Sequence, residues 1–209
     1  MKAVRLPGSR PLVSHGPSFW ESLYATETRP GWDMNGPTPL VQEVLDAAAA
    51  LGLAPGPDLA VPGCGFGHDA ADLARRGFRV TGVDFAPAAL QGARERYGDL
   101  VTWCQEDWFA GTDAAFDVLF DHTCFVAMPP SRRPDYLAAC ARRLRPGGLW
   151  LGCFFHEVLT EGTFPYAVSM ETLRSLAEPH FEILHLAKAE HSHPRRAGRE
   201  FLVIGRKRS

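Results

Sequence analysis

Residues 59–69 read Leu-Ala-Val-Pro-Gly-Cys-Gly-Phe-Gly-His-Asp and join a short apolar run to a helical pattern. Glycines at a turn between a strand and a helix let the backbone approach a ligand closely, and the helix start behind them presents free N–H groups. Asp84 ends the next predicted strand, 21 residues after Gly63. A carboxylate at that distance can accept hydrogen bonds from the hydroxyls of a ribose. The loop and the acid together predict a site for an adenosine-bearing ligand.

The spacing of the glycines separates the possible adenosine ligands. A dinucleotide fingerprint requires Gly or Ala at the sixth position counted from Gly63, and that position is His68. The chain also has no GxxxxGK[ST] phosphate loop, so the pattern argues against NAD(P) and ATP. The spacing present is G-x-G-x-G. Followed by an acidic strand end, it resembles the S-adenosylmethionine (AdoMet) site of class I methyltransferases.

Strand and helix patterns alternate along most of the chain. Apolar runs bounded by turn residues predict strands at 58–62, 78–84, 100–104, 116–121 and 149–155. Helical spacing predicts helices from Pro37 and at 69–76, 87–97, 132–144 and 169–178. Two consecutive strands, 181–187 and 200–205, close the chain. This order predicts an α/β fold with a doubly wound, mainly parallel, seven-stranded sheet and an antiparallel edge strand.

Composition excludes several classes of protein. The 209 residues carry a formal charge of -2, whereas nucleic-acid-binding domains are usually strongly basic. No apolar stretch approaches the ~20 residues that cross a bilayer, and the start lacks the apolar core of a signal peptide. The five cysteines are widely spaced without a CxxC pair, which favours reduced thiols. We expect a cytoplasmic monomer with no nucleic-acid or membrane partner.

Domain organisation follows from length and from the N-terminal composition. Residues 1–18 are rich in Pro, Gly and Ser, so we expect a flexible segment there, with a lid over the site as one hypothesis for its role. Residues 19–209 are expected to form a single domain, since their number is near that of a typical domain.

Longer motifs flank the glycine loop in a fixed order. They are Phe19-Trp20-Glu21…Tyr24…Pro30-Gly31-Trp32-Asp33, Glu106-Asp107-Trp108-Phe109, Phe116-Asp117-Val118-Leu119-Phe120-Asp121-His122-Thr123, Thr163-Phe164-Pro165-Tyr166-Ala167-Val168-Ser169 and Gly198-Arg199-Glu200-Phe201-Leu202. From about residue 18 to the C-terminus the chain resembles the thiopurine S-methyltransferase superfamily of class I AdoMet-dependent methyltransferases. The plant halide/thiol (thiocyanate) methyltransferase branch is the more similar one.

The resemblance implies a set of residues that bind AdoMet. Aromatic side chains of the N-terminal segment would wrap the donor, the loop glycines would contact its methionine part, and acids would bind its ribose and adenine. The implied residues are Trp20, Tyr24, Trp32, Gly63, Gly65, Asp84, Asp107, Trp108 and His122. Tyr24 departs from the plant branch, which usually has Trp there. His122 falls where relatives carry Tyr or Arg near the sulfonium and the acceptor.

The acceptor pocket is implied by the same resemblance. Tyr166 matches an aromatic position that lines it, and His122 and Arg199 match positions near the acceptor. Arg195 and Arg196 stand in the same stretch as Arg199. Phe164 replaces a proline of the family pattern, which we expect to narrow the pocket.

Each assignment has an alternative structural interpretation. The aromatic residues could pin a loose N-terminus, Trp108 could belong to the core while Asp107 caps a turn, and Asp84 could cap a helix. His122 could be hydrogen-bonded to the backbone. Cys64 and His68 could form a nucleophile–base pair, but Cys64 lies between two loop glycines, where the cofactor would contact the backbone. His191 and His193 lack a third metal ligand of suitable spacing, so no metal is predicted.

The chemistry implied is an in-line displacement on the AdoMet methyl by a soft nucleophile. Alignment in a dry aromatic pocket would carry the reaction, so no acid–base group is required and no catalytic residue is assigned. We predict methyl transfer to a small thiol, thiocyanate or halide, with a heterocyclic thiol of the thiopurine kind or another small molecule as the alternative acceptor. A nucleotide-dependent oxidoreductase and a binding protein without turnover are the rival classes.

Overall fold

The computed structural model describes residues 16–26, 30–111, 116–158 and 164–208. The helices are α1 (Pro17–Thr26), α2 (Leu40–Ala49), α3 (His68–Arg75), α4 (Pro87–Tyr97), α5 (Cys124–Ala127), α6 (Arg133–Arg143) and α7 (Met170–Ala177). The strands are β1 (Asp58–Pro62), β2 (Arg79–Asp84), β3 (Thr102–Gln105), β4 (Phe116–His122), β5 (Leu144–Phe155), β6 (Phe181–Lys188) and β7 (Glu200–Lys207). Short 3₁₀ turns follow α4 (Gly98–Leu100) and precede α6 (Pro130–Arg132).

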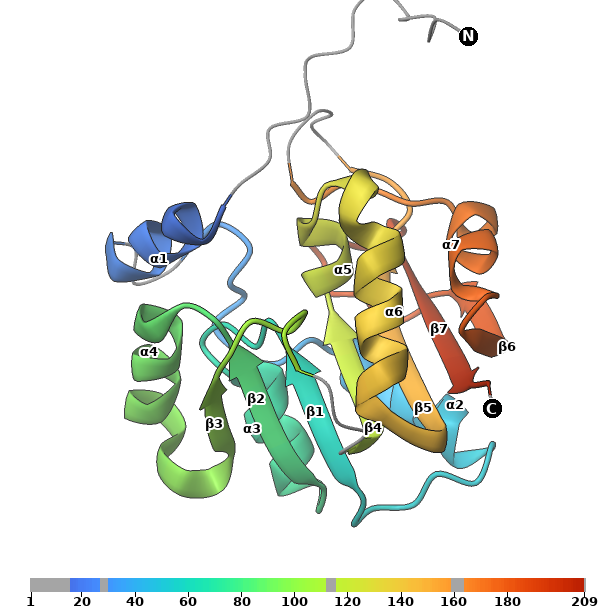
Figure 1. The fold of residues 1–209 in the computed structure, drawn as a ribbon, viewed down its shortest axis with the longest axis horizontal. Coiled ribbons are helices and arrows are strands. Elements are labelled where there is room, and N and C mark those ends of the chain that lie inside the picture. Colours follow the sequence, from blue (N-terminus) through green and yellow to red (C-terminus); the bar gives the residue numbers. More distant parts are fainter. Residues whose placement is uncertain (1–15, 27–29, 112–115, 159–163, 209) are drawn as a thin grey trace, which may run out of the picture.

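The strands form one seven-stranded sheet in the order β3-β2-β1-β4-β5-β7-β6. The first five pair in parallel. Strand β7 lies between β5 and β6 and is antiparallel to both, because β6 and β7 follow one another without a crossover helix. This arrangement confirms the predicted fold class (Figure 1).

Side-chain alternation along the strands produces two core layers. In β1, Leu59 and Val61 face one apolar cluster and Ala60 faces the other, as the period of two in a strand requires. Trp150 and Phe154 of β5 belong to the layer under α6 and α7, whereas the opposite layer is covered by α2 and α3. The sheet is therefore covered by helices on both faces, as in a doubly wound fold.

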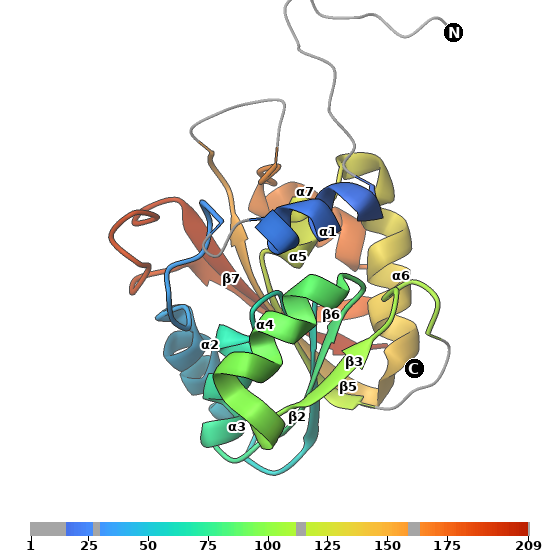
Figure 2. The same cartoon turned by 90° about the vertical axis from the view of Figure 1, so that its left-hand side faces the viewer.

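The N-terminal part differs from the expectation. Pro17 and Ser18 form the first turn of α1, so the boundary predicted at residue 18 falls inside a helix. Residues 1–15 of the predicted flexible segment lie outside the described residues. Helix α1 has no fully buried residue. Its apolar residues nevertheless recur at helical spacing, as Phe19, Trp20, Leu23 and Tyr24. It lies above α4, near the carboxyl ends of the parallel strands (Figures 1 and 2).

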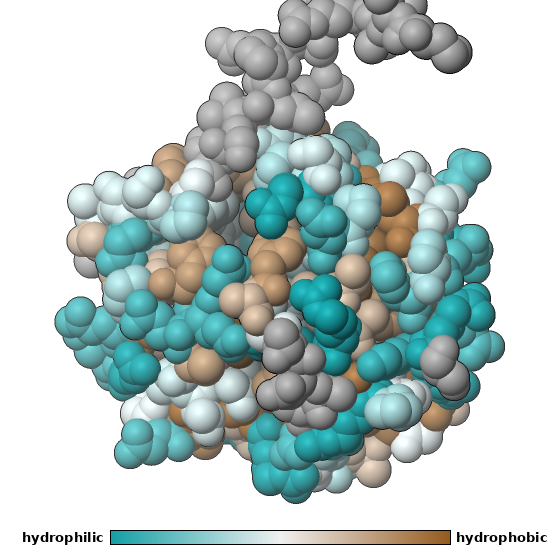
Figure 3. All heavy atoms as spheres, in the orientation of Figure 1, coloured by the Kyte–Doolittle hydropathy of each residue, from teal (hydrophilic) through white to brown (hydrophobic). Residues whose placement is uncertain are grey.

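On the face of the molecule seen in Figure 1, the described residues form no broad apolar patch. Hydrophobic spheres are scattered among hydrophilic ones there (Figure 3). Leu51 and Leu100 are the exposed large hydrophobic residues of the described chain. None of the helices in the described ranges is long and apolar enough to cross a bilayer.

Candidate active site

The glycine loop turns sharply between β1 and α3. Gly63, Gly65 and Gly67 have φ angles of 58°, 53° and 78°, a region that favours glycine. A Cβ on Gly63 would lie 2.7 Å from Cys124 Sγ, and one on Gly65 would lie 2.8 Å from the hydroxyl of Tyr24. These glycines therefore allow both the turn and the close approach of neighbouring side chains.

Asp84 lies across from the loop at the end of β2. Its Oδ2 accepts the N–H of Gly65 at 2.9 Å, and its Oδ1 accepts the N–H of Ala86 at 3.0 Å. The carboxyl is buried, and burial raises its pKa, opposed by these backbone hydrogen bonds. Asp84 thus caps the turn before α4, as the structural interpretation allowed, and also borders the cavity described next.

A cavity of about 1100 Å³ opens at the carboxyl ends of β1, β2 and β4. Pockets that hold one drug-sized ligand measure roughly 300–1000 Å³, so this one has room for a donor and a small acceptor together. Its lining includes Trp20, Tyr24, Trp32, Gly63, Gly65, Asp84, Asp107, Trp108, His122 and Arg199. The structure thus gathers every residue predicted to contact the donor around one cavity.

An aromatic wall forms one side of the cavity. The ring centroid of Phe164 lies 4.8 Å from that of Trp20 and 5.5 Å from that of Trp32. Tyr24 packs edge-on against Trp32 and Phe66. Helix α1, the segment before α2 and the segment after β5 meet in this wall, so three distant parts of the chain enclose the cavity.

Two residues at the start of α3 hold the segment before α2, residues 30–39, which we call the strap. His68 Nε2 lies 3.1 Å from Asp33 Oδ1, and its Nδ1 lies 2.5 Å from the hydroxyl of Tyr97. Asp69 Oδ1 accepts the N–H of Thr38 at 2.7 Å. The histidine that departs from a dinucleotide fingerprint therefore anchors the strap over the glycine loop.

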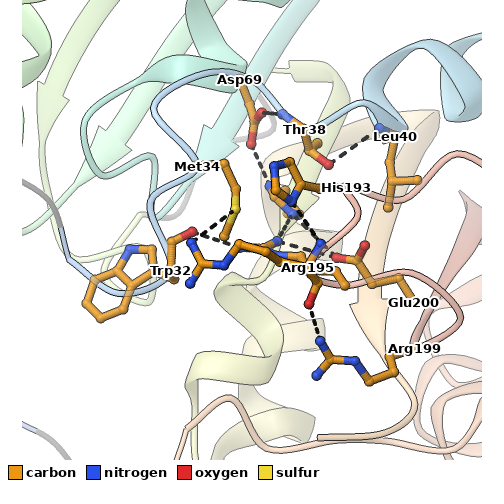
Figure 4. A network of polar contacts seen from close by, with 11 residues as sticks. Trp32, Met34, Thr38, Leu40, Asp69, His193, Arg195, Arg199 and Glu200 are labelled. Atoms are coloured by element: carbon orange, nitrogen blue, oxygen red, sulfur yellow. Dashed lines mark hydrogen bonds and ion pairs between the residues drawn. The ribbon is translucent and has the colours of Figure 1, made fainter. Parts of the chain in front are cut away.

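His122 takes part in a polar network that includes Asp69 and Glu200, both of which Figure 4 labels. Its Nδ1 lies 2.7 Å from Asp69 Oδ2, and Arg196 Nη1 lies 2.7 Å from its Nε2. Arg196 also donates to the carbonyl of Trp32 at 2.9 Å and to Glu200 Oε1 at 3.4 Å. Because a guanidinium only donates, Nε2 accepts here and Nδ1–H donates to Asp69. Both ring nitrogens are thus occupied by protein groups.

The charges around His122 act in opposite directions on its pKa. Burial disfavours the imidazolium, but the carboxylates of Asp69 and Glu200 together raise the pKa of His122, while Arg196 opposes that rise. Proton uptake at Nε2 would break the contact with Arg196 and turn the N–H toward Glu200, whose Oε1 lies 3.9 Å away. We interpret His122 as a positioning residue between the strap and β7.

Asp107 and Trp108 occupy the side of the cavity nearest β3. Asp107 accepts the N–H of Phe109 at 3.0 Å and so caps a turn. Trp108 is buried, with the guanidinium of Arg143 4.3 Å from its ring centroid and Phe116 stacked on it. Asp107 therefore caps a turn and Trp108 is buried, as the alternative structural interpretation stated, and both residues also line the cavity.

Tyr166 is not among the described residues that line the cavity, in contrast to the prediction; Phe164 and Pro165 are. Tyr166 is buried, its N–H donates to the carbonyl of Val126 at 2.6 Å, and its carbonyl accepts from Arg133. These main-chain contacts tie Tyr166 to α5 and α6, so Phe164 provides the aromatic ring at this wall.

Asp121 lies fully buried at the end of β4. Its Oδ2 accepts the hydroxyl of Tyr136 at 2.8 Å, and its Oδ1 accepts the N–H of Phe125 at 3.3 Å. Burial raises the pKa of Asp121 to about 6 despite these hydrogen bonds. These two hydrogen bonds of Asp121 hold α5 and α6 beside the end of β4.

The geometry does not support the two other sites considered from sequence. Burial raises the pKa of the Cys64 thiol, and His68 is already held by Asp33 and Tyr97. His191 pairs with Glu43 at 3.3 Å. No group of three potential ligands that could hold a metal occurs within residues 16–26, 30–111, 116–158 and 164–208.

Sequence reasoning assigned no role to three residues that take part in the polar network around His122. Asp69, Thr38 and Glu200 carried no local signal of a partner, because their partners lie 31 or more positions away except for the Arg196–Glu200 pair. Arg196 was indicated by the sequence only as a member of the same stretch as Arg195 and Arg199. Its burial, unusual for a guanidinium, is visible only in the structure.

The cavity suits an adenosyl sulfonium. The glycine loop presents backbone without side chains, Asp84 lies opposite, and Asp69, Asp33 and Glu106 add negative charge to the lining. A family model of thiopurine S-methyltransferases matches residues 15–204. The chain belongs to the thiopurine S-methyltransferase family.

Known proteins support this assignment. Thiocyanate methyltransferase 1 of Arabidopsis thaliana is 31% identical over 191 residues, which cover 88% of this chain and 82% of that protein. The 2-heptyl-1-hydroxyquinolin-4(1H)-one methyltransferase of Mycobacteroides abscessus is 28% identical over 185 residues, 82% of this chain and 79% of that protein. The predicted family and the predicted class of enzyme, an AdoMet-dependent methyltransferase, are thereby confirmed.

A solved structure agrees with the fold. The 1,6-didemethyltoxoflavin-N1-methyltransferase of Burkholderia thailandensis, solved with 1,6-didemethyltoxoflavin and S-adenosylhomocysteine bound, superposes with a TM-score of 0.74. The two chains are 21% identical, and the match covers 97% of this chain and 94% of the other. The class I methyltransferase fold is therefore shared.

Proposed function

We propose that this thiopurine S-methyltransferase family member methylates a small soft nucleophile, with a thiol as the first candidate. The observation that carries the proposal is the composition of the cavity. It joins a glycine loop and Asp84 to an aromatic wall and four arginines of the described chain, and the imidazole of His122 is already hydrogen-bonded on both sides. Such a cavity can align and enclose reactants, and His122 is not free to deprotonate a hard nucleophile.

The cavity divides into two ends in this proposal. The donor end comprises Gly63, Gly65, Asp84, Asp107 and Trp108, which follow β1, β2 and β3. The acceptor end comprises Phe164, Arg195 and Arg199, which line the same cavity. Trp20 and Trp32, which the resemblance assigns to the donor, pack against Phe164. The sheet order places β2 and β3 on one side of β1 and β4, and β5 and β7 on the other. The donor end therefore extends from β1 toward β3, and the acceptor end lies on the β7 side of β4.

AdoMet would supply a methyl group on a sulfonium. An acceptor thiolate, formed by loss of the thiol proton to solvent, would bond to the methyl carbon as the bond from that carbon to the sulfonium breaks, which gives a thioether and S-adenosylhomocysteine. Asp84 is placed to accept hydrogen bonds from ribose hydroxyls, and the glycine loop allows the donor to approach the backbone. The aromatic wall excludes water and orients the acceptor. Correct alignment of two reactants can lower the barrier by up to about 7–11 kcal/mol, which makes positioning the main contribution of these residues.

Ionisation of the acceptor matters as well. A thiol with a pKa near ~8.5 is only a few per cent thiolate at neutral pH. Arg195 and Arg199 add positive charge to the acceptor end, which raises the thiolate fraction. Arg196 contributes less, because Glu200 neutralises it.

A heterocyclic thiol is the second candidate acceptor. The volume of about 1100 Å³ and the aromatic wall of Trp20, Trp32 and Phe164 suit a flat ring that stacks on indole or phenyl groups. We keep a monomeric state and a reduced, cytoplasmic setting as part of the proposal. The free thiol state of all five cysteines supports the second of these.

A panel assay tests the proposed function. Purified protein is incubated with AdoMet and, separately, iodide, bromide, thiocyanate, hydrosulfide, a small alkyl thiol and a thiopurine, and S-adenosylhomocysteine is quantified. We expect release above background with the thiols first. Release with none of the six acceptors, from protein that binds S-adenosylhomocysteine, would contradict the proposed acceptor class.

A further inference from the structure

Two arginines at the acceptor end have no carboxylate partner among the described residues. Arg195 donates from Nη2 to the carbonyl of Gly31 at 3.2 Å, and its Nη1 lies 3.8 Å from Met34 Sδ. Arg199 donates to the carbonyl of Arg195. Figure 4 shows both guanidinium groups beside the polar network. Main-chain carbonyls therefore hold these side chains in place without neutralising their charge.

The acidic residues that line the same cavity already have partners. They pair with imidazole rings, with Arg143 or with backbone N–H groups: Asp33 with His68, Asp69 with His122, Asp84 with Gly65 and Ala86, Glu106 with Arg143, and Asp107 with Phe109. Arg196 is matched by Glu200. Arg195 and Arg199 thus leave positive charge at the acceptor end that a ligand can neutralise.

The loop that carries the two arginines is anchored at several points. Glu43 of α2 accepts the N–H groups of Glu190 and His191 at 3.0 and 2.9 Å. The N–H of Ala189 donates to the carbonyl of Glu200 at 3.0 Å, and the buried side chain of Arg196 fixes the loop from inside. A loop fixed before binding loses less conformational entropy when a ligand arrives.

The position of the loop points to the acceptor rather than the donor. Glu200, which ends the loop, pairs with Phe155 at the end of β5. The ribose- and adenine-side residues Asp84 and Asp107 follow β2 and β3, on the other side of β1 and β4. A charged group bound by Arg195 and Arg199 would therefore belong to the molecule that enters beside the aromatic wall.

We propose that the acceptor carries a carboxylate in addition to its soft nucleophilic atom, and that Arg195 and Arg199 bind this carboxylate. The guanidinium is a planar fork of N–H donors that matches a carboxylate in a bidentate manner, whereas a soft anion such as thiocyanate gains nothing from the fork. The inference rests on the proposed function, since it names the class of thiol that the same site takes: a mercapto carboxylic acid.

Matched acceptors test the inference. Mercaptoacetate, 3-mercaptopropionate and 6-mercaptohexanoate are each compared with the corresponding amide, which keeps the thiol and the shape but removes the charge. The enzymes are the wild type, Arg195→Gln, Arg199→Gln, the double variant and Arg206→Gln. Arg206 is the control because its ion pair with Glu182, 3.7 Å long, lies in the β6–β7 pair away from the cavity.

For at least one chain length we expect kcat/KM of the wild type for the acid to exceed that for the amide by about 10–100-fold, the usual effect of a hydrogen bond to a charged group. In the double variant the rates for acid and amide should become equal. The amide and thiocyanate rates should themselves fall, because the acceptor end loses positive charge, but by less than the rate for the acid. Arg206→Gln should behave as the wild type. Equal wild-type rates for acids and amides at all three lengths would overturn the inference, as would an equal loss for thiocyanate.

Binding measured without turnover separates the inference from the proposed function. The S-methylated acids and amides are titrated by calorimetry into each protein saturated with S-adenosylhomocysteine. Tighter binding of an acid than of its amide, lost in the double variant, supports the inference even if no thiol is turned over, in which case only the proposed function fails. If instead the double variant weakens the binding of S-adenosylhomocysteine itself tenfold, the arginines bind the donor and the inference is wrong.

Discussion

At the donor end, Asp84 and the glycine loop lie on two neighbouring strands, and backbone N–H groups bind the carboxylate directly. At the acceptor end, His122 reaches Asp69 and Arg196 across 53 and 74 positions of the chain, and Arg196 reaches Trp32 across 164. The first region is built from a local turn and one strand end. The second depends on a buried ionic network that holds distant segments together.

The difference between the two ends suggests a division of roles. The backbone of a tight turn keeps its hydrogen-bonding groups when side chains elsewhere are substituted. The donor end can therefore keep its structure while substitutions at the acceptor end change which acceptor is bound. The acceptor end consists of side chains on segments joined by long-range contacts, and each can be replaced. We infer that specificity for the acceptor is set by the strap, Phe164 and the arginine loop.

Removal of Arg196 should cause the largest loss of stability. Arg196→Met leaves the buried Glu200 carboxylate without its cation, and breaking a buried ion pair in this way costs about 3–5 kcal/mol. Urea denaturation measures the loss. Arg195→Met is the control, because Arg195 is exposed and most surface substitutions change stability by less than about 0.5 kcal/mol. Equal effects of the two substitutions would show that the network does not hold the acceptor end together.

Asp84→Asn should weaken the donor end alone. An amide loses the negative charge toward the ribose hydroxyls, and a hydrogen bond to a charged group contributes about 1.5–3 kcal/mol, so binding of S-adenosylhomocysteine should fall about 10–100-fold. Asp117→Asn is the control, since Asp117 pairs with Arg145 near the amino end of β4, at the opposite end of the strand from the cavity. A dissociation constant that Asp84→Asn leaves unchanged would show that Asp84 only caps the turn.

Asp121→Asn should alter the pH dependence of stability. The folded chain keeps this carboxyl protonated up to a pKa of about 6, above the ordinary 3.8, so its contribution to stability is lost as pH rises from about 4 to 6. An asparagine side chain does not ionise, so Asp121→Asn does not lose this part of the free energy of unfolding as the pH rises. Its free energy of unfolding relative to the wild type should therefore rise by on the order of 2 kcal/mol between pH 4 and pH 7. A constant difference across that range would mean that Asp121 is ionised in the folded chain.

The smallest effect is expected at the aromatic wall. Phe164→Leu removes ring contacts with Trp20 and Trp32, and such pairs contribute about 0.5–1.5 kcal/mol. KM for a thiol acceptor should rise a few-fold, while binding of S-adenosylhomocysteine stays the same. If the affinity for S-adenosylhomocysteine fell as much as KM for the acceptor rose, the aromatic wall would contact the donor as well as the acceptor.

The two regions also differed in how far the sequence predicted them. An apolar run bounded by turn residues placed β1 at 58–62, and helical spacing placed α4 at 87–97, as found. The spacing of Asp84 from the loop indicated the donor end. Helix α1 was missed because its aromatic residues were interpreted as ligand contacts, although Phe19, Trp20, Leu23 and Tyr24 recur at helical spacing. Tyr166 was misplaced because main-chain contacts to α5 and α6 hold it. The network of His122 was missed because long-range ion pairs have no local pattern.

Calorimetric titration of S-adenosylhomocysteine into the wild type, with Asp84→Asn and Arg195→Gln alongside, tests the central claim most directly. We predict one site per chain, affinity about tenfold or more weaker in Asp84→Asn, and affinity unchanged in Arg195→Gln. Absence of binding by the wild type, or weakening by Arg195→Gln rather than Asp84→Asn, would contradict the account.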